Sequence, residues 1–155
     1  QRPNEVDGED YLFLGLRAFE DKIHEGAFVE WEEVYPGRMY GTLFSEVARI
    51  ARQGKAALFD VDVNGGQNLK ERFQQDALAI FIAPPSLEAL RDRLQRRGTD
   101  TPEQIEQRLD RMRFEQTQAQ AFDHVVVNDD FNQALARLEE LVRAFLVQFN
   151  DQPAS

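Results

Sequence analysis

The chain has 155 residues, of which 42% are apolar and 30% charged, and its formal net charge is −10 at pH 7. This composition is typical of a single soluble globular domain, and the negative charge excludes nucleic acid and anionic membranes as natural partners. The absence of cysteine rules out disulfides, zinc–cysteine sites, iron–sulfur clusters and cysteine nucleophiles, and it suits a reducing compartment. No apolar run approaches the ~20 residues needed to cross a bilayer, so we expect a cytoplasmic protein.

The first half of the chain predicts strands and helices in alternation. Apolar residues at helical spacing predict helices at residues 16–25 and 43–53, each followed by a glycine as a stop signal. The tripeptide Tyr40-Gly41-Thr42 is interpreted as a turn that carries two hydroxyl groups. Short apolar or alternating runs predict strands at residues 11–14, 27–34 and 56–63.

The second half continues the alternation. Residues 77–83 and 125–127 are short apolar runs, typical of strands buried on both faces of a parallel sheet. Ser86 is expected to begin a helix over residues 86–97, and Thr101-Pro102-Glu103-Gln104 opens a longer one with a capping-box pattern. A C-terminal helix with an apolar face over residues 135–146 precedes a polar tail. The pattern predicts an α/β fold, with a mostly parallel sheet covered by helices on both faces.

Two aspartates interrupt the strand expected over residues 56–63. Strand alternation would place Asp60 and Asp62 on one face, at the carboxyl end of the strand, where parallel sheets bind ligands. Such a pair can organise a hydrated Mg²⁺ or accept hydrogen bonds from a ligand amine. The alternative is a strand end that emerges into water, where aspartate is an ordinary terminator.

Arginine dominates the basic residues, and seven arginines fall between residues 91 and 113. Arg93, Arg97 and Arg108 lie on two expected helices that are joined by the turn Gly98-Thr99-Asp100. Because guanidinium groups bind phosphate in a bidentate manner, such a hairpin can close over a small phosphorylated ligand as a lid. The alternative is that these arginines cover exposed helix faces and pair with neighbouring carboxylates.

Eight motifs, in this order, resemble those of guanylate kinases. They are R-P-N-E-V-D-G-E-D-Y at 2–11, F-V-E-W at 28–31, Y-G-T at 40–42, D-V-D-V-N-G at 60–65, I-A-P-P-S at 82–86, R-R-G-T-D at 96–100, R-L at 108–109 and V-V-N-D-D at 126–130. The resemblance covers essentially the whole chain. It implies one domain with the three-layer α/β/α fold of P-loop nucleoside monophosphate kinases, including a small α+β GMP-binding region over about residues 1–55 and a helical lid with the helix that follows it over about residues 93–113.

The resemblance also implies an activity, the transfer of a phosphoryl group from ATP to GMP with Mg²⁺ as the cofactor. Glu30, Thr42 and Asp62 would hold the guanine. A carboxylate suits guanine, whose N1–H and N2 amine are neighbouring donors, and the threonine hydroxyl can satisfy O6. The other residues implied at the GMP site are Arg2, Tyr11 and Tyr40 for the phosphate, with Asp60 and Gly65 beside them.

The same resemblance assigns residues to phosphoryl transfer. Arg97 and Arg108, with Arg93 as a weaker match, correspond to arginines that neutralise the phosphates, and Arg97 would also contact ATP. Asn128 corresponds to a position near the adenine. Asp60 corresponds to a position near the Mg²⁺, which it would contact through water.

The sequence departs from the family at its start. It contains no G-x-x-x-x-G-K-[ST] pattern, the P-loop that holds ATP and Mg²⁺, and it does not begin with Met. We therefore expect the chain to be the downstream part of a longer enzyme, monomeric or a small homo-oligomer, and inactive without the P-loop. Two alternatives are a non-catalytic guanylate kinase-like module that binds a protein partner and a kinase of another nucleoside monophosphate.

Overall fold

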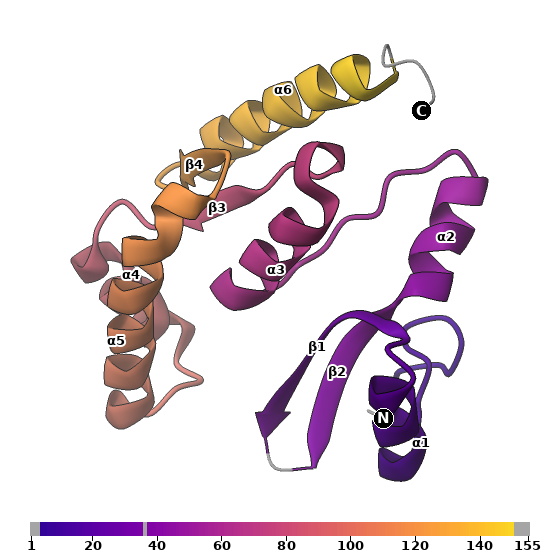
Figure 1. Ribbon diagram of the computed structural model, residues 1–155. Coiled ribbons are helices and arrows are strands. Elements are labelled where there is room, and N and C mark those ends of the chain that lie inside the picture. The colour runs from indigo at the N-terminus through magenta and orange to yellow at the C-terminus, as the bar shows by residue number, and fades with distance from the viewer. Residues whose placement is uncertain (1–3, 36, 151–155) are drawn as a thin grey trace. The chain divides into compact units, whose positions relative to one another are not determined.

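A computed structural model of the chain describes residues 4–35 and 37–150. The chain divides into two compact units, Gln1–Asp60 and Val61–Ser155, which are described separately (Figure 1). Arg2 and the polar tail after Asn150 lie outside the described residues. In the part of the chain that is described, none of the helices has both the length and the hydrophobicity that a membrane crossing requires.

The first unit is an antiparallel ribbon with two short helices. Its elements are α1 (Leu16–His24), β1 (Phe28–Tyr35), β2 (Arg38–Leu43) and α2 (Phe44–Arg52). The two strands pair in antiparallel register, with Phe28 opposite Leu43. Phe19 of α1 stacks on Phe28 with ring centroids 4.4 Å apart, and both side chains are buried. The predictions of helices at 16–25 and 43–53 and of a strand at 27–34 are confirmed.

Two predictions in this unit are wrong. Residues 11–14 form a loop: Tyr11 makes only an isolated β-bridge with Asp7, and the backbone N–H of Phe13 donates a hydrogen bond of 2.8 Å to the Asp7 carboxylate. Tyr40-Gly41-Thr42 is part of β2 rather than a turn. Gly41 lies opposite Trp31, and the glycine serves a close approach of the two strands rather than a reversal of the chain.

The second unit contains the parallel strand pair and most of the helices. Its elements are α3 (Val63–Phe73), the short 3-10 helix η1 (Gln74–Asp76), β3 (Ile80–Ala83), α4 (Leu87–Arg97), α5 (Pro102–Gln118), η2 (Ala119–Ala121), β4 (His124–Val127) and α6 (Phe131–Asn150). Strands β3 and β4 are parallel, with Ile80 opposite His124 and Ala83 opposite Val127. The strands are shorter than the apolar run 77–83 suggests, and the predicted helices α4, α5 and α6 are confirmed.

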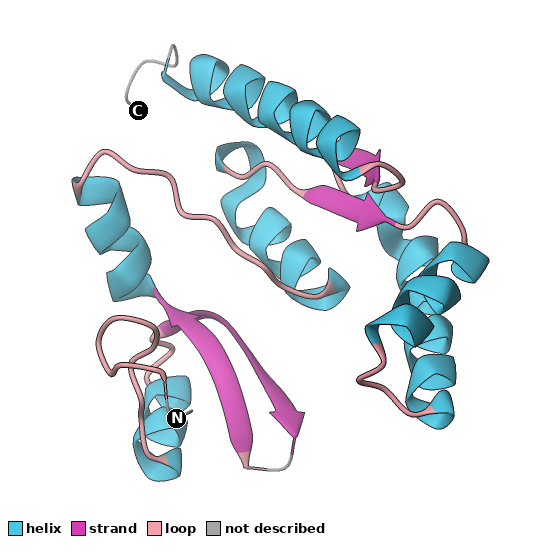
Figure 2. Ribbon diagram, turned by 180° about the vertical axis from the view of Figure 1, so that it is seen from behind, coloured by secondary structure: helices cyan, strands magenta, loops and turns pink. Residues whose placement is uncertain are grey.

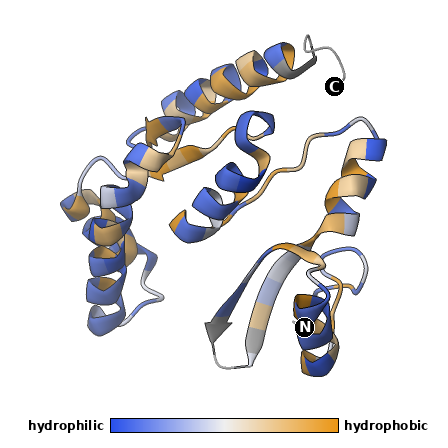
Figure 3. Cartoon of the chain, in the orientation of Figure 1, coloured by the Kyte–Doolittle hydropathy of each residue, from blue (hydrophilic) through white to orange (hydrophobic). Residues whose placement is uncertain are grey.

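Helices pack on both faces of this strand pair, as predicted. Phe81 and Ala83 belong to a buried cluster with Val63, the first residue of α3. Val126 belongs to a second cluster with Leu141 of α6. Figure 2 shows α6 running beside the two strands, and Figure 3 shows β3 as a hydrophobic ribbon and α6 with alternating hydrophobic and hydrophilic positions.

The strand predicted over residues 56–63 is absent. Residues 56–62 have no regular secondary structure and pair with no strand in the described part of the chain, and Leu58 is 95% exposed. A strand exists only where a neighbouring strand satisfies its backbone groups, so apolar character alone is not sufficient. The aspartates therefore do not share a strand face: Asp62 is the N-cap residue of α3, and Asp60 lies in the extended segment before it.

Candidate functional site

A carboxylate and a hydroxyl face each other across the antiparallel ribbon of the first unit. Glu30 of β1 lies opposite Thr42 of β2, and the Thr42 hydroxyl donates a hydrogen bond of 2.8 Å to Oε1 of the partly buried Glu30. The neighbouring Gly41 permits this pairing. A Cβ at position 41 would lie 2.7 Å from the carbonyl oxygen of Glu30 and 2.8 Å from Cβ of Trp31. The structure thus brings together two residues that the sequence predicts to bind guanine.

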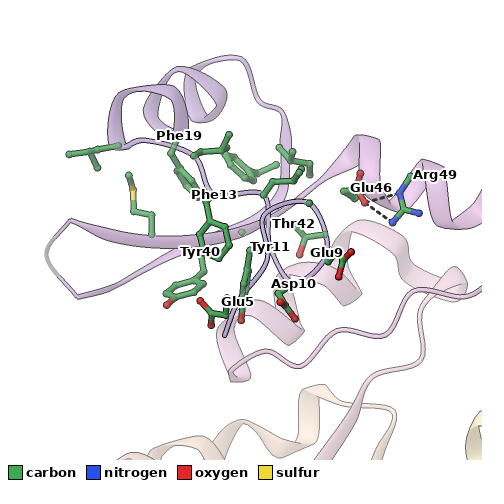
Figure 4. A pocket seen from close by; sticks show the side chains of 18 of the residues that line it. Glu5, Glu9, Asp10, Tyr11, Phe13, Phe19, Tyr40, Thr42, Glu46 and Arg49 are labelled. Carbon is green, nitrogen blue, oxygen red and sulfur yellow. Dashed lines mark hydrogen bonds and ion pairs between the residues drawn. The ribbon is translucent and has the colours of Figure 1, made fainter. Parts of the chain in front are cut away.

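Two tyrosines line a pocket of about 830 Å³ in the same unit (Figure 4). Tyr11, from the N-terminal loop, and Tyr40, from β2, meet edge to face with ring centroids 5.9 Å apart, and each is about half exposed. The loop is held by Gly8, whose N–H donates to the carbonyl oxygen of Tyr11 at 2.7 Å and whose φ of +83° favours glycine. Both phenols can donate a hydrogen bond to an anion.

The pocket lining carries charges of both signs. Arg49 is paired with Glu46 at 2.8 Å, as Figure 4 shows. The other carboxylates of the lining are Glu5, Glu9 and Asp10. A phosphate in this pocket would therefore need additional positive charge. Arg2, which the resemblance assigns to the GMP phosphate, lies outside the described residues, and its role stays a prediction.

Asp62, in the second unit, uses both carboxylate oxygens. Oδ1 accepts a hydrogen bond of 2.8 Å from the backbone N–H of Gly65, which caps α3, and Oδ2 lies 3.0 Å from Nη2 of Arg111. The Asp62 side chain is only 15% exposed, whereas that of Arg111 is 59% exposed. Asp62 is therefore a fixed acceptor, and a ligand amine that reaches it would have to share or displace these donors.

The other two predicted residues near this helix differ in their surroundings. Asp60 is exposed in the segment that precedes α3. Gly65 lies in the first turn of α3, where a Cβ would stand 3.1 Å from Cβ of Val61. Among the described residues, no group of three or more His, Cys, Asp or Glu side chains could hold a metal ion.

Helices α4 and α5 form the hairpin that the sequence predicts as a lid (Figure 1). Gly98 ends α4 with a φ of +69°, and Thr101 begins α5 with a complete capping box. Leu94 of α4 packs against Ile105 and Leu109 of α5, and all three are buried. Local stop and start signals thus define the turn, and the small core joins the helices.

The turn of the hairpin carries a carboxylate, Asp100, that contacts one arginine from each of the two helices. Asp100 Oδ2 lies 2.6 Å from Nη2 of Arg97, and Asp100 Oδ1 lies 3.4 Å from Nε of Arg108. The hydrogen bond from Arg97 lowers the pKa of Asp100 below its ordinary value, and the positive charge of Arg108 lowers it further against the effect of desolvation. The carboxyl is therefore ionised at neutral pH.

Arg93 is used differently from the other two predicted arginines. Its Nη1 donates to the carbonyl oxygen of Asn128 at 2.6 Å, and its Nη2 donates to the carbonyl oxygen of Asp129 at 2.9 Å. These bonds join α4 to the loop after β4. The geometry gives Arg93 a structural role, and its predicted part in phosphate neutralisation, like the predicted adenine contact of Asn128, stays a prediction.

Sequence reasoning missed two residues of these arrangements. Asp100 was interpreted only as a turn residue, and Arg111 only as one arginine of the cluster over residues 91–113. The signal for Asp100 is a carboxylate directly between two arginine-bearing helices. The signal for Arg111 is weaker, because it contacts Asp62, 49 positions away in the sequence.

Comparisons with known proteins agree on one family. The sequence model described as guanylate kinase matches residues 1–145. Guanylate kinase of Porphyromonas gingivalis is 45% identical over 147 residues, which is 95% of this chain and 78% of that protein. Guanylate kinase of Salinibacter ruber is 47% identical over 145 residues, which is 94% of this chain and 77% of that protein.

Among solved structures, the crystal structure of guanylate kinase from Anaplasma phagocytophilum superimposes with a TM-score of 0.69 and 29% sequence identity. It is matched over 93% of this chain and 69% of its own. The α/β architecture, the motifs and these matches lead to one conclusion: this chain belongs to the guanylate kinase family.

Proposed function

We propose that this protein transfers the terminal phosphoryl group of ATP to GMP and so forms ADP and GDP. The family membership supports the reaction, and the Glu30–Thr42 pair is the single observation that carries the choice of GMP. A partly buried carboxylate needs donors to compensate for its lost hydration. Guanine offers two adjacent donors, N1–H and the N2 amine, whereas adenine carries a hydrogen-bond acceptor at N1.

Recognition of guanine requires a small exchange of hydrogen bonds. The Thr42 hydroxyl has one proton, which it donates to Glu30 in the structure. When guanine binds, its N1–H and N2 amine would donate to Glu30, and the hydroxyl would rotate to donate to O6. Asp62 would accept from the N2 amine while it keeps the cap of α3. The ribbon thus presents an acceptor and a donor in the order that guanine needs.

Hydroxyl and guanidinium groups would bind the phosphate groups. The Tyr11 and Tyr40 hydroxyls would donate to the GMP phosphate, together with the guanidinium of Arg2. Arg97 and Arg108 would neutralise the charge that develops on the transferring phosphoryl group, which requires positioning and positive charge more than covalent chemistry.

Mg²⁺ would accompany ATP and supply additional neutralisation of the phosphate charge. Within the described residues the absence of a three-ligand cluster fits an ion held mainly by phosphate and water oxygens. Asp60 is exposed and would contact such an ion through water. Asn128 would lie near the adenine.

The test is an ADP-release assay on the full-length protein with GMP, AMP, CMP and UMP. The variant Glu30→Gln keeps the size of the side chain but turns one oxygen acceptor into a donor. We expect its kcat/KM for GMP to fall by about 10- to 100-fold, and the preference for GMP to weaken, because hydrogen bonds to a charged acceptor are lost. Glu20→Gln, at an exposed position of α1 outside the pocket lining, is the matched control and should change kcat/KM less than twofold.

Two results would contradict the proposal. An unchanged preference for GMP in Glu30→Gln would remove Glu30 from guanine recognition. If the wild-type protein released no ADP with any nucleotide, the non-catalytic module would replace the kinase as the function of this chain.

A further inference from the structure

The carboxylate of Asp100 is enclosed by two arginines that come from different helices. Arg97 is the last residue of α4, and Arg108 lies in α5. Each guanidinium contacts a different oxygen of Asp100, Oδ2 at 2.6 Å and Oδ1 at 3.4 Å. The Asp100 side chain is 9% exposed, while those of Arg97 and Arg108 are 52% and 54% exposed. The acid is thus covered, and the two cations remain accessible to an anion.

This arrangement solves an electrostatic difficulty. Two guanidinium groups that must act on one phosphate repel each other when the phosphate is absent. One carboxylate between them offsets that repulsion and leaves a net positive charge for the ligand. Arg97 has a further restraint, because its Nε donates to the Thr99 hydroxyl at 3.0 Å. These contacts occupy a part of the five N–H donors that each guanidinium carries.

We infer that Asp100 is a positioning residue that holds Arg97 and Arg108 together as one phosphate-binding pair before substrate arrives. The inference rests on the proposed function, which assigns the two arginines to the transferring phosphoryl group. Preorganised positive charge stabilises a transition state better than charge that must be collected during the reaction. Asp100 touches neither substrate in this account and acts only through its two partners.

The same hairpin contains a natural control. Glu106 of α5 forms an ion pair with Arg91 of α4, so it joins the same two helices as Asp100 does. Among the described residues, the hydrogen bonds and the ion pair of Glu106 go to Arg91 and not to Arg97 or Arg108. Loss of the Glu106 carboxylate should therefore weaken the hairpin without disturbing the arginine pair.

The experiment compares Asp100→Asn, Asp100→Glu and Glu106→Gln with the wild type in the full-length protein. Steady-state kinetics would give kcat and the KM for GMP and ATP. We expect Asp100→Asn to lower kcat by about tenfold or more, with KM for GMP within about twofold, because misplaced groups affect the chemical step most. Asp100→Glu restores the charge and should recover most of kcat, and Glu106→Gln should keep kcat within about twofold of the wild type.

A second measurement needs neither activity nor a variant. In NMR spectra of the wild type without nucleotide, the Nε–H resonances of Arg97 and Arg108 report whether the two guanidinium groups are restrained. We expect both to show slow side-chain motion and slow hydrogen exchange compared with Arg143, which is 80% exposed on α6. This result is independent of turnover, so it separates a failure of the inference from a failure of the proposed function.

The inference is overturned if both resonances are as mobile as that of Arg143. It is also overturned if Asp100→Asn keeps kcat within twofold of the wild type, or if Glu106→Gln loses kcat to the same extent. If the wild type transfers no phosphoryl group while both arginines are restrained, the proposed function is wrong, but the inference that Asp100 holds Arg97 and Arg108 together is retained. Should Asp100→Asn fail to fold, the wild-type resonances and Asp100→Glu still decide.

Discussion

Asp62 connects the start of helix α3 to helix α5 through Arg111: its Oδ1 caps α3, and its Oδ2 lies 3.0 Å from Nη2 of Arg111. One carboxylate therefore has a helix-capping task and an ion-pairing task. The two tasks can be separated by substitution, because asparagine keeps the capping oxygen but loses the charge.

We predict that Asp62→Ala lowers the free energy of unfolding by about 1 kcal/mol through loss of the cap. Asp62→Asn should lower it by less, since asparagine is an equally good N-cap residue. A double-mutant cycle of Asp62→Asn with Arg111→Ala should give a coupling energy of about 0.5 kcal/mol, because the arginine is largely exposed. Equal losses for Asp62→Ala and Asp62→Asn in urea unfolding would contradict the capping role.

Gly41 is the position at which the ribbon tolerates no side chain. We predict that Gly41→Ala destabilises the protein by about 1–3 kcal/mol, because a Cβ there would meet main-chain and side-chain atoms at less than 3 Å. Gly15→Ala is the control for steric space, since a Cβ at Gly15 meets nothing within 4 Å among the described residues; its expected loss, from the N-cap position of α1, is smaller, at about 0.5 kcal/mol. Thermal unfolding measures both. Equal melting temperatures for Gly41→Ala and Gly15→Ala would contradict the prediction, because they would show that strands β1 and β2 can move apart at position 41 without loss of stability.

The start of α5 should depend on its capping box. Thr101→Ala removes the hydroxyl that accepts from the backbone N–H of Gln104 at 3.3 Å, and we predict a loss of about 1 kcal/mol of stability. Thr117, near the end of the same helix, is the control, because Thr117→Ala removes no N-cap. Chemical denaturation of the two variants measures the difference, and equal stabilities would argue against the cap.

The contribution of the Arg91–Glu106 ion pair should depend on pH. The hydrogen bond from Arg91 holds the pKa of Glu106 below its ordinary value of 4.5. A carboxyl whose pKa is lower in the folded state stabilises the protein above its unfolded pKa, and this stability is lost as pH falls through the folded pKa. The wild type should therefore exceed Glu106→Gln in Tm at neutral pH, and the difference should shrink as pH falls below 4.5. A difference in Tm that stays constant to about pH 3 would contradict the folded-state pKa shift.

The parts of the fold that follow from local signals could be predicted from the sequence. Ser86 and Gly98 define the two ends of α4, the capping box at Thr101 defines the start of α5, and each acts within one helical turn of its own position. Because these signals define the two helices, they also place Arg97 on α4 and Arg108 on α5. Their grouping around Asp100 could not be predicted, because side-chain direction depends on how the two helices pack.

The failures have a different origin. Residues 56–62 have the composition of a buried strand, but pairing with another strand decides whether a strand forms, and this is not a local property. Helix α3 was missed because Gly65 and Gly66 have low helix propensity, although Asp62 before them is a good N-cap residue. Gly66 lies where a Cβ would come within 2.9 Å of the Phe122 ring, so packing rather than propensity explains the glycine.

Among the described residues, the hydrogen bonds of Arg93 go to the main-chain carbonyls of residues 128 and 129, and a longer ion pair of 3.6 Å joins its Nη2 to Oδ1 of the exposed Asp129. Every amino acid supplies such a carbonyl, so the two hydrogen bonds do not depend on which side chains residues 128 and 129 carry, and only the exposed ion pair requires an acid at position 129. Substitution of Asn128 would therefore leave both hydrogen bonds of Arg93 to the loop in place. The attachment of this loop to α4 is therefore mainly a property of the loop's backbone and of one arginine.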